Sequence, residues 1–306
     1  MADARGARFV VAGTRGYPEL LAQIHAPPVG LFVRGLALES AMPAVAIVGT
    51  RRATPRGLAH AGRLARELVS RGIAVVSGLA RGIDTAAHEG ALDAGGTTIA
   101  VLGSGLDRIY PPENAGLCEE IAKRGVVVTE FPYGQDPRPG SFPQRNRIIA
   151  GLSIGVIVVE AGERSGALIT AARALEQGRE VFAVPGPVGE ATTRGPHSLI
   201  KVGAKLVESI EDVLVELEGS WGEFPVRTAV FTSGESPVQG ASCAECESPV
   251  QGIAGLLDLL SLTPTPPDTL AEKLGAPLGE VLATLMELEL RGLAKAWPGG
   301  LYTRTR

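Results

Sequence analysis

The stretch VAIVGTRRATPRG, residues 45–57, joins an apolar run that ends at Gly49 to a segment with helical periodicity. A short apolar run without alternation indicates a strand buried on both faces, as in a parallel sheet covered by helices. The glycine and three arginines between the run and the helix form a loop whose backbone amides can face an anion at the positive helix end. This stretch therefore predicts an α/β fold with an anion-binding loop after a buried strand.

The same alternation of short apolar runs and helical segments continues along the chain. We expect strands at 45–48, 73–76, 98–102, 126–129, 155–159 and 181–184. We expect helices at 57–71, 83–94, 117–123 and 167–177. Such alternation is typical of a parallel sheet with helices on both faces, so the fold class is an extended Rossmann-like α/β domain.

The 306 residues, 45% of them hydrophobic, allow one large core and a smaller module. We expect a lead-in segment at 1–42, the Rossmann-like domain at 43–218, a flexible linker at 219–252 and a winged-helix-like domain at 253–306. The linker is rich in Pro, Ser, Gly and Glu and repeats the hexapeptide Glu-Ser-Pro-Val-Gln-Gly at 235–240 and 247–252, which favours disorder.

The last segment has the element order of a winged helix, three helices followed by a hairpin. We expect its helices at 253–262, at 269–274 after an N-cap at Asp268, and at 278–291, and its hairpin strands at 293–296 and 301–304.

The distribution of charge matters more than the formal net charge of −4. Residues 49–205 carry 19 basic and 15 acidic side chains, whereas residues 206–306 carry 6 basic and 15 acidic ones. The middle of the chain is mildly basic and its cations are mostly arginine, which suits a polyanionic partner.

Nothing in the sequence indicates a membrane span or a signal peptide, so we expect a cytoplasmic protein with no membrane partner. The three cysteines, Cys118, Cys243 and Cys246, argue against a disulfide framework. The lone CxxC at 243–246 is open to two interpretations, half of a zinc or redox site or an accident of linker composition. We favour the second and expect no metal, since a zinc site needs two more ligands.

Four further loops follow predicted strands and carry candidate chemistry. In SGLARGID, 77–84, Arg81 is a candidate phosphate contact, and Asp84 with His88 is either an acid–base pair or a helix cap with an orienting hydrogen bond. After LGSGLD, 102–107, Tyr110 either stacks a base or closes the loop.

In GSFPQRNR, 140–147, placed just before an apolar helix, two arginines flank an amide beside an aromatic ring. This combination suits a nucleic acid strand, although a capped loop with arginines in salt bridges would also show it. In EAGERSGALIT, 160–170, Ser165 and Gly166 precede a helix and form an anion cradle. Glu160 there is a candidate base, but no nucleophile or metal partner accompanies it.

Together these loops resemble the DprA/Smf family, the DNA-processing proteins of natural transformation. The resemblance rests on VAIVGTRRATPRG, VVSGLARGIDTAAHEGAL, IAVLGSGLDRIYPPEN, FPQRNRIIAGLS, VIVVEAGERSGALITAARALEQGREVFAVPG and HSLIKVGAKLV, which cover residues 43–215 in order. It implies an extended Rossmann domain that binds single-stranded DNA, forms homodimers and loads the recombinase RecA onto incoming DNA in competition with single-strand binding protein.

The resemblance and the loops together give a set of candidate DNA-binding residues, with no catalytic residue, metal or cofactor. They are Gly49, Thr50, Arg51, Arg52, Gly78, Arg81, Gly105, Tyr110, Phe142, Arg145, Asn146, Arg147, Ser165, Gly166 and Lys201.

The sequence departs from the family in three places. Pro112 stands where many members have a basic residue, which weakens any contact predicted there. Only about 40 residues precede the Rossmann part, so we expect no N-terminal SAM-like helical domain. In the predicted recognition helix, Glu280, Glu287 and Glu289 outnumber Arg291, so we expect this module to contact protein or mediate dimerisation rather than to grip DNA.

Two other functions remain open. A nucleotide-cleaving enzyme would use Glu160, but such enzymes show a PGGxGT loop and this chain has SGALIT at 165–170. A small-ligand sensor with a winged-helix output is disfavoured by the acidic recognition helix.

Overall fold

The computed structural model describes residues 6–221, 265–274, 294–297 and 301–304, and the single positions 281, 284, 285 and 288. The chain forms two compact units, Met1–Phe231 and Thr232–Arg306.

The first unit is built on a nine-stranded sheet in the order β1-β2-β6-β5-β4-β3-β7-β8-β9. From β6 to β9 every neighbouring pair is parallel, and β1 and β2 form an antiparallel edge beside β6. The bounds are β1 (Ala7–Val11), β2 (Gly30–Gly35), β3 (Ala44–Val48), β4 (Ala74–Ser77), β5 (Thr98–Val101), β6 (Val126–Thr129), β7 (Gly155–Val158), β8 (Glu180–Ala183) and β9 (Lys205–Leu206).

The central strands β3 to β7 are buried at every residue, as their continuous Val, Ile and Ala runs predict. All six predicted strands are confirmed to within one residue at each end. Segment 1–42, which we treat as a lead-in, supplies β1 and β2 to this same sheet.

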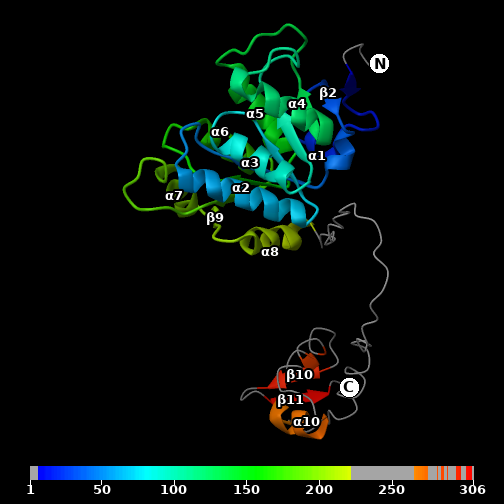
Figure 1. Ribbon diagram of the computed structural model, residues 1–306, viewed down its shortest axis with the longest axis vertical. Coiled ribbons are helices and arrows are strands. Elements are labelled where there is room, and N and C mark those ends of the chain that lie inside the picture. Colours follow the sequence, from blue (N-terminus) through cyan, green and yellow to red (C-terminus); the bar gives the residue numbers. More distant parts are fainter. Residues whose placement is uncertain are drawn as a thin grey trace, which may run out of the picture. The chain divides into compact units, whose positions relative to one another are not determined.

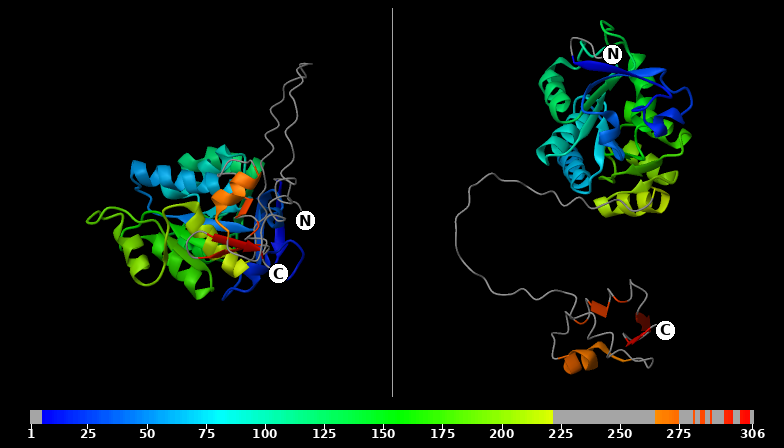
Figure 2. Two further views of the ribbon diagram at one scale, coloured as in Figure 1. Left: turned by 90° about the horizontal axis from the view of Figure 1, so that it is seen from below. Right: turned by 90° about the vertical axis from the view of Figure 1, so that its right-hand side faces the viewer.

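Helices cover both faces of the sheet, as the apolar strands require. One face packs against α2 (Pro55–Ser70), α3 (Ile83–Asp93), α4 (Ala115–Arg124) and α8 (Ile210–Trp221). The other packs against α1 (Glu19–Ala22), α5 (Ser141–Gly151), α6 (Gly166–Glu176) and α7 (Arg194–Lys201). Short 3-10 turns lie at η1 (Leu38–Ala41) and η2 (Pro112–Asn114). Figure 1 shows α2 and α3 side by side, and the left view of Figure 2 shows cyan helices on one side of the sheet and green helices on the other.

One predicted loop is wrong. Residues 140–147 do not form a loop before a helix, because α5 already begins at Ser141. Pro143 lies in the first turn, where a missing backbone N–H breaks no intrahelical bond, so it does not stop the helix. Arg145, Asn146 and Arg147 are therefore successive helical residues and point in different directions, about 100° apart.

In the second unit, β10 (Ala294–Trp297) and β11 (Leu301–Arg304) form the predicted antiparallel hairpin, and α10 (Pro267–Leu274) precedes them. The four single positions are helical, and a small core gathers Leu270, Val281, Leu285, Leu288 and Ala294. The N-cap predicted at Asp268 is wrong, because α10 begins one residue earlier. The predicted helix at 253–262, the repeated hexapeptide, Cys243 and Cys246, and the charged side chains of the predicted recognition helix lie outside the described residues.

In the ranges that the structure describes, no helix has the length and apolar character that a membrane span needs. Within the same ranges, no group of three or more His, Cys, Asp or Glu side chains gathers as a metal site would.

Candidate nucleic-acid interface

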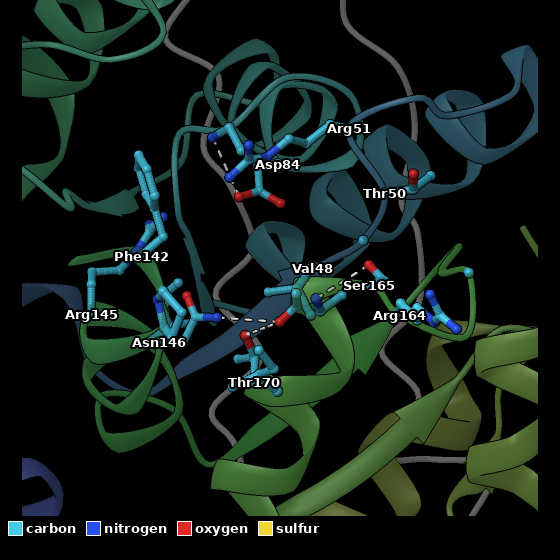
Figure 3. Close-up of a pocket in the computed structure, with 18 of the residues that line it drawn as sticks. Val48, Thr50, Arg51, Asp84, Phe142, Arg145, Asn146, Arg164, Ser165 and Thr170 are labelled. Carbon is cyan, nitrogen blue, oxygen red and sulfur yellow. Dashed lines mark hydrogen bonds between the residues drawn. The ribbon is translucent and has the colours of Figure 1, made fainter. Parts of the chain in front are cut away.

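The candidate site lies where the strand order of the parallel sheet reverses. The chain enters the parallel sheet at β3, continues outward through β4, β5 and β6, and returns to place β7, β8 and β9 on the opposite side of β3. The loops that follow β3 and β7 therefore diverge, and a crevice opens between them at the carboxyl ends of the strands. A pocket of about 780 Å³ occupies this crevice, lined by the loop after β3, the loop before α6 and the start of α5 (Figure 3).

The rim of this pocket is cationic. Arg51 and Arg52 belong to the loop after β3 and Arg164 to the loop before α6, and all three side chains are exposed. Among the described residues, none of the three has an ion-pair partner, whereas most other arginines of the unit do. Their charge is consequently available to an anion.

An aromatic pair stands beside these cations. The rings of Tyr110 and Phe142 lie 5.7 Å apart at 45°. The guanidinium carbon of Arg51 lies 5.3 Å from the centre of the Phe142 ring, within the range of a cation–π contact. Tyr110 is 39% exposed and so presents a flat apolar surface to the pocket.

Arg145 lies in the floor of the pocket instead of on its rim. Its side chain is only 4% exposed and donates a hydrogen bond to the carbonyl of Val101 at the end of β5. A Cβ built on Gly78 would overlap the guanidinium, so the loop after β4 passes directly over it. Burial lowers the pKa of Arg145 to about 10, and the nearby Asp84 carboxylate opposes this shift. Arg145 therefore packs under the loop after β4 and bonds to the end of β5.

Asp84 anchors the loop after β4. Its Oδ2 accepts hydrogen bonds from the backbone amides of Gly78 at 3.1 Å and Ala80 at 3.4 Å. Burial raises the pKa of this carboxyl, and the charge of Arg145 and the backbone amides oppose the rise. The Asp84 carboxylate thus both offsets the buried charge of Arg145 and orders the loop after β4.

His88 does not form an acid–base pair with Asp84. It is fully buried, and its Nδ1 lies 2.7 Å from the hydroxyl of Thr98. The N-cap of α3 is Gly82, so Asp84 belongs to the first turn and not to the cap. Both interpretations of these two residues are therefore wrong in part: Asp84 is neither an acid–base partner of His88 nor the cap, and its carboxylate accepts from the loop amides instead.

The wall opposite α5 is the N-terminus of α6. Ser165 is its N-cap, and the Ser165 hydroxyl accepts from the amide of Ala167 at 3.3 Å. The side-chain amide of Asn146 donates to the carbonyl of Gly166 at 3.2 Å and so ties α5 to α6. Figure 3 shows Phe142, Arg145 and Asn146 on one side of the pocket and Arg164 and Ser165 on the other. The positive end of α6 adds to the attraction for an anion here.

Glu160 follows β7 but is not among the residues that line the main pocket. Its Oε2 accepts from the amide of Thr54 at 2.9 Å and its Oε1 from the hydroxyl of Thr54 at 2.5 Å, and the residue is 4% exposed. Both carboxylate oxygens are therefore engaged with the loop after β3.

The structure brings most of the sequence-predicted residues to one place. The main pocket is lined by Gly49, Thr50, Arg51, Arg52, Tyr110, Phe142, Arg145, Asn146, Ser165 and Gly166. A small pocket that shares its lining with the first adds Gly78 and Arg81. The exposed Arg81 is paired with Glu113.

Three predicted residues line neither pocket. Gly105 packs against the backbone of Pro132, Arg147 is paired with Glu130 away from the rim, and Lys201 ends α7. The sequence prediction also missed Arg164. Arg164 immediately precedes Ser165 and Gly166, and this position could have predicted it, because a loop at the switch point exposes its polar side chains to the crevice.

The fold and the pocket define a Rossmann-like α/β protein whose switch-point crevice is cationic and lined with aromatic rings. The chain belongs to the family described as DNA recombination-mediator protein A, whose family model matches residues 8–218. A second model, the DprA winged helix domain, matches residues 253–300 and confirms the predicted winged helix.

Known relatives agree with this assignment. The chain is 41% identical over 301 residues to Protein Smf of Escherichia coli, covering 97% of this chain and 77% of the relative. It is 48% identical over 202 residues to DNA processing protein DprA of Streptococcus pneumoniae, covering 66% and 71%.

Two solved structures share the fold. The X-ray structure of the Streptococcus pneumoniae protein superposes with a TM-score of 0.66 at 46% identity, over 68% of this chain and 74% of that one. The DNA processing protein A of Helicobacter pylori superposes with a TM-score of 0.62 at 32% identity, over 69% and 96%, and its structure was described for its single-stranded DNA binding mode.

Proposed function

We propose that this chain is a DNA-processing protein that binds single-stranded DNA in the switch-point pocket. It protects incoming DNA and loads the RecA recombinase onto it during natural transformation, and the same activity serves recombination and repair. Membership of the family and the single-stranded DNA binding mode of the Helicobacter pylori relative support the DNA ligand.

The observation that carries the proposal is the combination of free cations and aromatic faces in one pocket. Arg51, Arg52 and Arg164 offer charge to phosphates, and Tyr110 and Phe142 offer stacking surfaces to bases. Phosphate contacts alone would serve duplex and single strand alike. Aromatic stacking is open only to unpaired bases, so the combination favours a single strand.

We propose further that the chain binds DNA without catalysing a reaction and without a cofactor. The engagement of both Glu160 oxygens with Thr54 supports this, because this candidate base is turned toward the loop after β3. Turnover of a nucleoside monophosphate by the purified protein would contradict it.

The partners that we propose for this DNA-binding role are RecA, single-strand binding protein and a second copy of the chain, acting in the cytoplasm. The acidic character of residues 206–306 supports a role for the winged-helix domain in contacts with protein. RecA filament growth on DNA coated with single-strand binding protein should accelerate when this chain is added. Sedimentation should give twice the mass of one chain, and a monomer at micromolar concentration would exclude the dimer.

A salt series with single-stranded and duplex DNA of equal length tests the central proposal. We expect tighter binding of the single strand and a steep fall in affinity with salt. Equal affinity for both forms would refute the assignment of the pocket to single-stranded DNA.

A further inference from the structure

The loop after β3, residues 49–54, is held at both ends by a single residue, Glu160. At one end, the amide of Thr50 donates to the backbone carbonyl of Glu160 at 2.6 Å. At the other, the amide and hydroxyl of Thr54 both donate to the Glu160 carboxylate. Between these two anchors lie Arg51 and Arg52, the exposed cations of the pocket rim.

These contacts of Glu160 with Thr50 and Thr54, here called the clamp, extend into the first turn of α2. Thr54 is the N-cap, and its hydroxyl accepts from the amide of Gly57 at 3.1 Å while it donates to Glu160. A Cβ built on Gly57 would overlap the Glu160 carboxylate, so the carboxylate fills the space that this glycine leaves. A buried negative charge is also favoured at the positive end of a helix. The Glu160 side chain and the start of α2 therefore hold each other in place.

We propose that Glu160 is a positioning residue for DNA binding, which acts through the loop and holds Arg51 and Arg52 toward the pocket. This inference rests on the proposed function, because it takes single-stranded DNA as the ligand of those arginines. It gives the glutamate after β7 a role that does not require it to touch the ligand.

The proposal predicts an effect opposite in sign to simple electrostatics. Removing a carboxylate near a DNA-binding pocket should strengthen binding if only charge matters. Removing the clamp instead frees the loop, and apparent affinity falls in proportion to the fraction of time that the loop spends in its binding arrangement. If that fraction drops to about one fifth, Glu160→Ala binds single-stranded DNA about fivefold more weakly.

Three full-length variants separate these effects. Glu160→Ala should weaken binding and lower the salt slope, by up to about 1.4 if both arginines are lost at about 0.7 per phosphate contact. Glu160→Gln should bind as wild type, because its amide oxygen still accepts from the Thr54 amide and its nitrogen can donate to the Thr54 hydroxyl. Glu190→Ala is the charge control. It removes a carboxylate that pairs with Arg56 on α2 without touching the loop, and should leave binding unchanged or tighter.

Two measurements decide the outcome. In the background Arg51→Ala/Arg52→Ala, the further change Glu160→Ala should have little effect, whereas a full additional loss would overturn positioning through these arginines. Amide hydrogen exchange should quicken at Thr54 and Gly57 in Glu160→Ala and not in Glu160→Gln. Unchanged exchange would overturn the clamp itself. If exchange quickens in Glu160→Ala but the wild-type protein does not bind single-stranded DNA, the clamp is supported and the proposed function is refuted.

Discussion

Acidification should destabilise this protein through His88. The imidazole, on α3, is fully buried, and its Nε2 has no hydrogen-bond partner among the described residues. Thr98 donates its hydroxyl proton to the carbonyl of Val75, so it can only accept from Nδ1, which fixes the neutral tautomer. Burial, together with the charge of Arg145, lowers the pKa of His88 from 6.5 to about 3.

The size of the effect follows from proton linkage. The folded pKa lies below the unfolded one, so the unfolded chain takes up the proton first. The stability that the neutral ring contributes is complete above about pH 6.5 and is lost as the pH falls toward 3. Between about pH 7.5 and about pH 5 the loss amounts to roughly 1.5 pKa units, or about 2 kcal/mol.

Urea unfolding at both pH values, on wild type and on His88→Asn, measures this term. Asparagine keeps a donor for Thr98 but does not titrate, so the variant should be less stable at neutral pH yet lose about 2 kcal/mol less on acidification. The difference between the two pH dependences isolates His88 from the carboxyl groups that titrate in the same range. Equal dependences, or an NMR titration of His88 near neutrality, would refute the reasoning.

Three substitutions test the site itself. Arg51→Ala should weaken single-stranded DNA binding for any sequence and reduce the salt slope by about 0.7, measured by fluorescence anisotropy; an unchanged slope would exclude a phosphate contact. Phe142→Ala should cost about 1–3 kcal/mol of single-strand affinity and leave the slope intact, and equal losses on duplex would argue against base stacking. Arg147→Ala should lower the free energy of unfolding by about 3 kcal/mol, because it removes the ion-pair partner of the largely buried Glu130 carboxylate. The salt slope of DNA binding should stay as in wild type. A reduced slope there would place Arg147 on the DNA.

The parallel part of the fold could be predicted because it follows from local composition. Strands buried on both faces, such as β3 and β7, must be apolar throughout, and each one ends at a glycine or a polar loop. The antiparallel edge gives a weaker signal. After the buried Ala7, β1 alternates between half-buried and exposed residues over only four positions, and its pairing with β2 depends on contacts with residues farther along the chain.

The site could be predicted as a set of loops but not as a geometry. The sequence FPQRNR shows two arginines as equals, yet Arg145 lies beneath the loop after β4 because Asp84 offsets its charge there. Arg147 turns instead to Glu130. Asp84 lies in α3 and Glu130 follows β6, so nothing adjacent in the sequence distinguishes a rim arginine from a buried one.

Without a ligand, the Arg51 guanidinium and the Phe142 ring already interact with each other. A cation already covers one face of the ring, and this arrangement is worth about 0.5–1 kcal/mol at an exposed site. A base that takes that face must first displace the guanidinium, and the displaced charge is then free to meet a phosphate. Under the proposed function, the base and the phosphate would therefore be coupled ligands of this pocket, and a molecule that carries only one of them would bind more weakly.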